Sequence, residues 1–191
     1  MINDKFLEQL RKEYRANETA RRQIISAANN ILFAAKKNIF AIQRNDFKTA
    51  EEKMADIEKE LKNLEKRFGA ARLYNEGTYK AAVEEYLEGK TLYTVIKKKK
   101  IEAYKGLSLN YESYLGGICD MIGELVRYAT NQAAKGKFSE VAKIKKIAED
   151  IMGQLIDFDL TGYLRTKYDQ ARGHLRKLEQ MTYEIKLKNT K

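Results

Sequence analysis

The chain has 191 residues, and 37 Lys and Arg side chains against 27 Asp and Glu leave a formal net charge of +10. This excess favours a polyanionic partner such as nucleic acid, or an acidic membrane surface. A single cysteine and a single histidine exclude an internal disulfide and a zinc site built from His and Cys.

The N-terminal sequence MINDKFLEQLRKEY lacks the basic start and apolar core of a secretory signal, so a cytoplasmic protein is expected. No apolar stretch reaches the roughly 20 residues that a membrane span needs, and no membrane partner is expected. The length suits one domain, predicted to cover residues 1–191. The absence of proline and the many strong helix formers predict an all-α fold.

The apolar periodicity predicts an elongated antiparallel bundle of six to seven helices. The first helix should exceed about 35 residues and end near Asn45 and Asp46. Further helices are predicted at about 49–68, 75–99, 110–134, 139–158 and 161–187. TAEE at 49–52 resembles a capping box at the start of the second helix, and Gly69 and Gly136 are expected to end helices.

The stretch YLGGICDMIGELVRYA, at 114–129, combines glycines and carboxylates within one predicted helix. At about 100° per residue, one stripe within about 60° of Asp120 contains Gly116, Gly117, Gly123, Glu124, Arg127 and Asn131. Glycines inside a helix cost stability, so we expect another group to approach the backbone closely there. The opposite arc is apolar and contains Cys119, which is predicted to be buried and not to be a nucleophile.

A second acidic pair lies in YKAAVEEYLEGKTLY, at 79–93, where Glu85 and Glu88 are separated by three positions and share a face with small residues. Two consecutive helices that each present a carboxylate pair can build an oxygen-ligand site for Mg²⁺ or Mn²⁺. The predicted metal ligands and catalytic residues are Glu85, Glu88, Asp120 and Glu124. Iron is less favoured because neither pair has a histidine at the Glu-x-x-His spacing.

Such a site suits phosphodiester hydrolysis, because a bound metal activates water and stabilises charge on phosphate oxygens. The number of metal ions and the carboxylate that acts as base stay open. The alternative is that the carboxylates are solvated, or ion-paired above a helix crossing.

The same stretch resembles the family of translin and translin-associated factor X. The matching positions are Gly117, Gly123, Glu124, Leu125, Arg127, Asn131 and Gly136, with Tyr168, Leu175, Lys177, Glu179 and Tyr183 near the C-terminus. The segment AAKKNIFAIQRND at 34–46 is a further match. The four carboxylates are similar to the acidic positions of the family's catalytic branch.

This resemblance implies a closed, octamer-like homo-oligomer that binds single-stranded RNA, and possibly single-stranded DNA, and cleaves RNA with Mg²⁺. No small-molecule cofactor is expected. Correspondence with the family and position in the chain assign nucleic-acid contacts to Lys36, Lys37, Arg44, Arg72, Lys80 and Arg127. Arg127 could hold a phosphate or pair with Asp120 or Glu124.

Two other functions compete with a nuclease. A non-catalytic, translin-like oligomer would bind single strands while its acids only pair with basic residues. A structural coiled-coil protein is suggested by KMADIEKELKNLEKRF at 53–68. His174 is predicted to be a structural or interface residue.

Overall fold

The computed structural model describes residues 2–189, and all regular structure among them is helical, so the all-α prediction is confirmed. The elements are α1 (Asp4–Gln43), α2 (Phe47–Phe68), α3 (Ala70–Leu73), α4 (Gly77–Ile96), α5 (Tyr111–Ala134), α6 (Phe138–Leu155), the 3-10 turn η1 (Ile156–Phe158) and α7 (Gly162–Asn189). The six predicted helices are present close to their expected ranges. Only the short elements α3 and η1 were not expected.

Local sequence explains most of the helix ends. Asn45 adopts a positive φ of 61°, and the side chain of Asp46 then accepts a hydrogen bond from the backbone N–H of Thr49 at 3.2 Å. The N-cap of α2 is therefore Asp46, and the prediction of a capping box at 49–52 is wrong because an aspartate three positions earlier satisfies the free N–H groups. Gly69 and Gly136 have φ of 77° and 71° where α2 and α5 end, as predicted.

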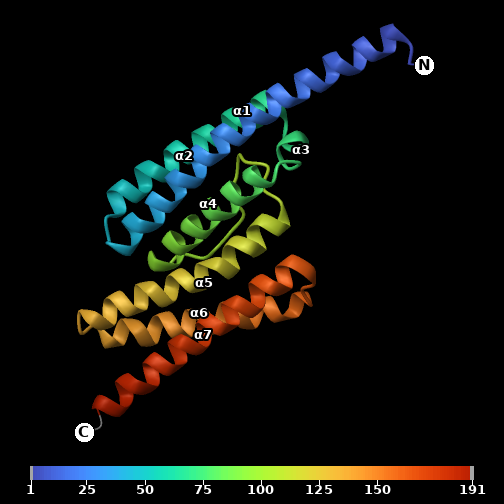
Figure 1. Ribbon diagram of the computed structural model, residues 1–191. Coiled ribbons are helices and arrows are strands. Elements are labelled where there is room, and N and C mark those ends of the chain that lie inside the picture. Colours follow the sequence, from blue (N-terminus) through green and yellow to red (C-terminus); the bar gives the residue numbers. More distant parts are fainter. Residues whose placement is uncertain (1, 190–191) are drawn as a thin grey trace.

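The helices stack in an elongated antiparallel arrangement (Figure 1). The α1–α2 hairpin lies along one side, α4 packs against α1, α5 packs against α4, and the α6–α7 hairpin covers α5. The N-terminal end of α1 and the C-terminal end of α7 project beyond the packed helices at opposite ends of the molecule (Figure 1). Among the described residues, no helix is long and apolar enough to cross a membrane.

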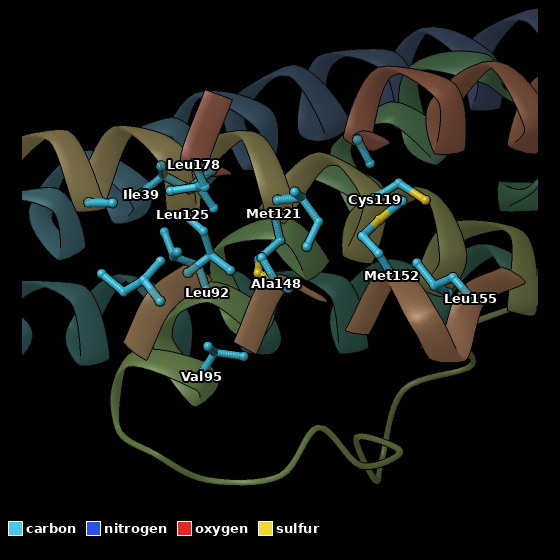
Figure 2. Close-up of a cluster of buried hydrophobic side chains, with 14 of the residues drawn as sticks. Ile39, Leu92, Val95, Cys119, Met121, Leu125, Ala148, Met152, Leu155 and Leu178 are labelled. Atoms are coloured by element: carbon cyan, nitrogen blue, oxygen red, sulfur yellow. The ribbon is translucent and has the colours of Figure 1, made fainter. Parts of the chain in front are cut away.

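Two hydrophobic clusters hold the stack together. One fills the space between α1, α2 and α4, where Ile31, Leu61 and Tyr86 are almost completely buried. The other joins α5 to α6 and α7 and extends to the ends of α1 and α4; Figure 2 shows Leu92, Met121, Met152 and Leu178 from four of these helices meeting in it. Because α4 and α5 both contribute to the second cluster, their facing surfaces are held rigidly against each other.

Candidate active site

The site begins where α4 and α5 cross at Gly117. A methyl group at Gly117 would lie 2.8 Å from Cβ of Leu87 and 3.0 Å from the backbone oxygen of Glu84 and the backbone nitrogen of Glu88. Only glycine permits this approach, because the obstructing atoms include main chain that cannot rotate away. The crossing brings the backbone of Glu88 directly against α5.

The other two glycines of the stripe also receive close neighbours, as the sequence predicts. A side chain at Gly116 would overlap the carboxylate of Glu84, and a methyl group at Gly123 would lie 3.2 Å from Nε2 of His174. The stripe therefore packs against α4 at one end and against α7 at the other.

The two predicted acidic pairs face the same space. Glu88, Asp120 and Glu124 line a pocket of about 360 Å³, together with Arg127 and His174. Glu85 lies beside it, because the negative charges of Asp120 and Glu124 act on its carboxyl group. The pocket opens between α4, α5 and α7, and we call it the acidic pocket.

Glu88 is the least compensated acid in the acidic pocket. Its carboxylate has no hydrogen-bond or ion-pair partner among the described residues, yet the carboxylate oxygens are not sealed from the pocket. Its pKa is raised to about 9, mainly by burial and then by the negative charges of Glu85, Asp120 and Glu124, against the opposing charge of Lys167. The pKa of Glu85 is also raised by burial, although Lys36 opposes this shift.

Asp120 is held by a lysine from α7. Lys167 Nζ lies 2.5 Å from Asp120 Oδ2 and 2.8 Å from Glu84 Oε1, and the hydroxyl of Tyr163 donates to the same Glu84 oxygen. Burial raises the pKa of Asp120 while Lys167 lowers it, and the net direction is upward. Burial lowers the pKa of Lys167, but its hydrogen bonds to Asp120 and Glu84 raise it by more, so the lysine stays charged.

Glu124 is held from α1 and from its own helix. Gln43 Nε2 donates to Glu124 Oε2 at 2.7 Å and to its backbone oxygen at 2.9 Å. Arg127 Nη1 lies 3.4 Å from Glu124 Oε2, so of the two roles considered for Arg127 the structure shows an ion pair with Glu124. Asn131 fixes Gln43 in turn by donating to its side-chain oxygen at 3.2 Å.

His174 and Cys119 form uncharged parts of the pocket wall. Burial, reinforced by Lys177, lowers the pKa of His174 against the opposing charges of Asp120 and Glu124, so the ring is neutral at neutral pH. Burial raises the pKa of Cys119 to about 12, which leaves the thiol protonated. A nucleophilic role for Cys119 is therefore as unfavourable as its sequence position predicts.

The chemistry of the acidic pocket fits a hard cation, although its present arrangement does not close around one. All four predicted ligands offer carboxylate oxygens, which Mg²⁺ and Mn²⁺ prefer, and Glu88 has no other partner. Within residues 2–189, however, no three His, Cys, Asp or Glu side chains are arranged to hold a metal ion. Asp120 and Glu124 are engaged by Lys167 and Gln43 and would have to turn from them.

The six basic residues predicted to contact nucleic acid divide into three groups. Lys36, Lys37 and Arg44 are exposed on α1 and have no ion-pair partner among the described residues. Arg72 and Arg127 are each paired with a glutamate, Arg72 with Glu76 at 2.6 Å. Lys80 is exposed and lines a separate pocket of about 800 Å³ beside Glu84.

Comparison with known proteins identifies the family. Residues 6–189 match the model of the Translin family. The chain belongs to the translin family. Its relatives include an uncharacterised protein of Methanocaldococcus jannaschii, 34% identical over 49% of this chain and 44% of the relative. Translin of Gallus gallus is 29% identical over 54% of this chain and 48% of the relative. The chain thus spans about half the length of the curated relatives it matches.

Solved structures share the fold of this translin-family protein. The crystal structure of apo-NeC3PO superposes with a TM-score of 0.84 at 24% identity and covers 96% of this chain and 97% of that one. The structure of AfC3PO in complex with duplex RNA gives a TM-score of 0.82 at 22% identity, covering 95% and 96%. At this level of identity the likeness establishes the helical arrangement.

Sequence reasoning missed three residues that shape the pocket of this translin-family protein. Lys167 and His174 are seven positions apart, so they lie on one face of α7; His174 lines the pocket and Lys167 pairs with Asp120 beside it. The seven-residue spacing indicates that the two side chains share a face, but the sequence does not show that this face packs against the acidic stripe of α5. Gln43 gave no comparable signal, because its contact with Glu124 joins residues 81 positions apart.

Proposed function

We propose that this translin-family protein is an oligomeric, Mg²⁺-dependent endoribonuclease that acts on single-stranded RNA at the acidic pocket. The observation that carries the proposal is that Glu88 of α4 lines one pocket with Asp120 and Glu124 of α5, with Glu85 beside it, and that the Glu88 carboxylate lacks any partner among the described residues. A buried, uncompensated carboxylate lowers stability, and such groups are concentrated at functional sites.

The comparisons support an RNA ligand. AfC3PO, which has the same fold, has been solved in complex with duplex RNA. The net charge of +10 suits a polyanion, and single-stranded DNA is a further candidate ligand.

Assembly is supported by the projecting end of α1. Ile2, Phe6, Leu10 and Tyr14 recur there every four residues and are 63%, 54%, 42% and 68% exposed. Such a stripe is typical of a helix that buries this face against another subunit.

Glu85, Glu88, Asp120 and Glu124 would hold the cation. When bound, Mg²⁺ supplies a Lewis acid that activates water and neutralises charge on the phosphate. The chain contributes the rest of the chemistry: Lys167 and Gln43 hold Asp120 and Glu124 until a cation displaces them, and the half-exposed guanidinium of Arg127 can reach a phosphate oxygen at the pocket mouth. Glu88 would release its proton when it binds a cation, so binding becomes tighter as pH rises.

A second function, a non-catalytic nucleic-acid-binding oligomer, is favoured by one specific observation. Asp120 and Glu124 already have cationic partners, as expected of acids that serve only to join α5 to its neighbours. The two functions differ in what happens to bound RNA when Mg²⁺ is added.

The test uses end-labelled, unstructured RNA incubated with the protein in Mg²⁺ or in EDTA. Wild-type protein should cleave the RNA in Mg²⁺ and not in EDTA. Glu88→Gln should slow cleavage at least about a hundredfold while changing the Kd for RNA less than about twofold. Glu149→Gln, which removes an acid of α6 paired with Lys145, is the matched control and should cleave normally. Equal rates for Glu88→Gln and the wild type would exclude the acidic pocket as the hydrolytic site.

A further inference from the structure

A stripe of aromatic and basic side chains runs along the solvent face of α1. Phe33, Lys37, Phe40 and Arg44 are spaced by four, three and four positions, so they lie on one side of the helix. The phenyl rings are 61% and 46% exposed. We call these four residues the aromatic–basic stripe.

Each ring of the stripe carries a cation from the next turn of the helix. Lys37 Nζ lies 4.2 Å from the centre of the Phe33 ring, and Arg44 Cζ lies 4.1 Å from the centre of the Phe40 ring. These contacts hold the rings in place with one face open to solvent, and they place a positive charge beside each ring.

The charge of this segment is of one sign. Between Glu18 and Asp46 the chain has no acidic residue, whereas it has the five cations Arg21, Arg22, Lys36, Lys37 and Arg44. The last three have no ion-pair partner among the described residues. Lys36 acts on Glu85, whereas the charges of Lys37 and Arg44 face no paired acid among the described residues and are available to an anionic ligand.

The stripe lies on the same helix as two residues that act on acids of the pocket region. Lys36 acts on the carboxyl of Glu85, and Gln43 bonds to Glu124, so these two residues mark the side of α1 that faces the pocket. At about 100° per residue, Phe33 and Phe40 are displaced from that side by about 60°. A strand that leaves the pocket over Lys36 therefore meets the rings next.

We propose that the aromatic–basic stripe binds the single-stranded RNA that extends from the acidic pocket, with bases stacked on Phe33 and Phe40 and phosphates paired with Lys37 and Arg44. This inference takes RNA as the ligand from the proposed function, on which it rests. It adds a physical reason why single strands are preferred to duplexes. Bases in a duplex are already stacked on each other and cannot lie on a phenyl ring, so the stripe favours single strands. A second copy of the same stripe is a poor partner, because symmetric contact would bring unpaired cations together.

The test measures fluorescence anisotropy of a labelled, unstructured oligoribonucleotide and of its duplex, in EDTA, over a series of salt concentrations. Phe33→Ala and Phe40→Ala should each weaken single-strand binding about tenfold, leave duplex binding within about twofold, and leave the salt dependence unchanged. Phe33→Trp and Phe40→Trp should restore binding. Lys37→Ala should weaken the binding of both the single strand and the duplex, and should lower the slope of log K against log salt by about one.

Phe138→Ala, which removes a 41% exposed phenylalanine from the start of α6, is the matched control and should bind like the wild type. Light scattering after gel filtration is measured on every variant. If Phe33→Ala and Phe40→Ala break the oligomer and leave RNA affinity unchanged, the stripe is a subunit contact and the proposal is wrong. Binding that needs Lys37 but not the rings also overturns it, whereas a wild type that binds no RNA overturns the proposed function itself.

Discussion

The two carboxylate pairs at the acidic pocket differ in the polar and charged partners that the fold places against them. On α5, Asp120 is bound by Lys167 from α7, and Glu124 by Gln43 from α1 and by Arg127. On α4, neither the Glu85 nor the Glu88 carboxylate has a hydrogen-bond or ion-pair partner among the described residues. The two pairs thus lie in or beside one pocket but differ in whether the protein places an opposite charge against them.

The difference follows from what each helix faces. Around the α5 pair, α7 and α1 supply long polar side chains, whereas α4 meets α5 through Gly117, which brings backbone and no cation to Glu88. Burying an ionised carboxylate without a partner is unfavourable in free energy, and the pKa of Glu88 is accordingly raised to about 9. The α4 carboxylates therefore lack a counter-charge at hydrogen-bonding distance within the described chain, whereas each α5 carboxylate has one.

The largest expected effect comes from removing the uncompensated charge of Glu88. Its pKa is raised by burial, so the folded state binds more protons than the unfolded state between about pH 5 and pH 9, and wild-type stability falls as pH rises through that range. One pKa unit corresponds to about 1.4 kcal/mol, so the rise from the ordinary value of 4.5 to about 9 corresponds to roughly 6 kcal/mol, which Glu88→Gln should remove. Urea unfolding across pH in EDTA measures it.

Glu58→Gln provides the control with the opposite sign. Burial raises the pKa of Glu58, but hydrogen bonds from Lys90 and Tyr86 lower it by more, and its net pKa is below the ordinary value. Its stabilising effect is present above the ordinary glutamate range and is lost as pH falls through the folded pKa, so the variant should be destabilised at neutral pH. If both glutamine variants gave the same pH profile, the contrast between compensated and uncompensated acids would fail.

A smaller effect is expected when the helix crossing is forced apart. Gly117→Ala places a methyl group against main chain of α4 and should cost about 3 kcal/mol in the free energy of unfolding. Gly153→Ala in α6 meets nothing within 4 Å and should instead stabilise by about 0.5–1 kcal/mol, because alanine favours a helix. Equal and small effects at both positions would show that the crossing is looser than described.

The smallest effect should come from removing the cation that pairs with an α5 acid, so that this acid, like Glu88, has no cationic partner. Lys167→Met leaves Asp120 buried without a cation, and because the pair is partly exposed we expect a loss of about 2 kcal/mol at neutral pH. The loss should shrink as pH falls through the folded pKa of Asp120, which lies above the ordinary aspartate value, because the carboxyl is then protonated in both proteins. Lys145→Met, from an i,i+4 pair on α6, should cost less than about 0.5 kcal/mol at any pH. The free energies of unfolding of the two variants, measured at two pH values, give this comparison.

Much of the fold could be predicted, because it depends on local patterns. Helical periodicity gave the six long helices, and Gly69 and Gly136 marked ends that need positive φ. The acidic and glycine-rich stripe of α5 could also be found by projection, since its residues lie within a few turns of one another. The start of α2 was misplaced because Asp46 and Thr49 compete for the same capping role.

The rest of the site depends on contacts between distant parts of the chain. Lys167 reaches Asp120 across 47 positions and Gln43 reaches Glu124 across 81, and periodicity cannot show which helices will face each other. Whether an acid is paired or uncompensated is decided by those neighbours and not by its own helix. The pocket's residue types were therefore predictable, and its charge balance was not.

The most direct test of a cation site shared by α4 and α5 is Mn²⁺ binding followed by electron paramagnetic resonance. Wild-type protein should bind Mn²⁺ at neutral pH, and Glu88→Gln and Glu124→Gln should each weaken binding at least about tenfold, because each removes one oxygen ligand from the same ion. Glu149→Gln should bind like the wild type. Mn²⁺ affinity that is unchanged by both pocket substitutions, or absent from the wild type, would contradict the account.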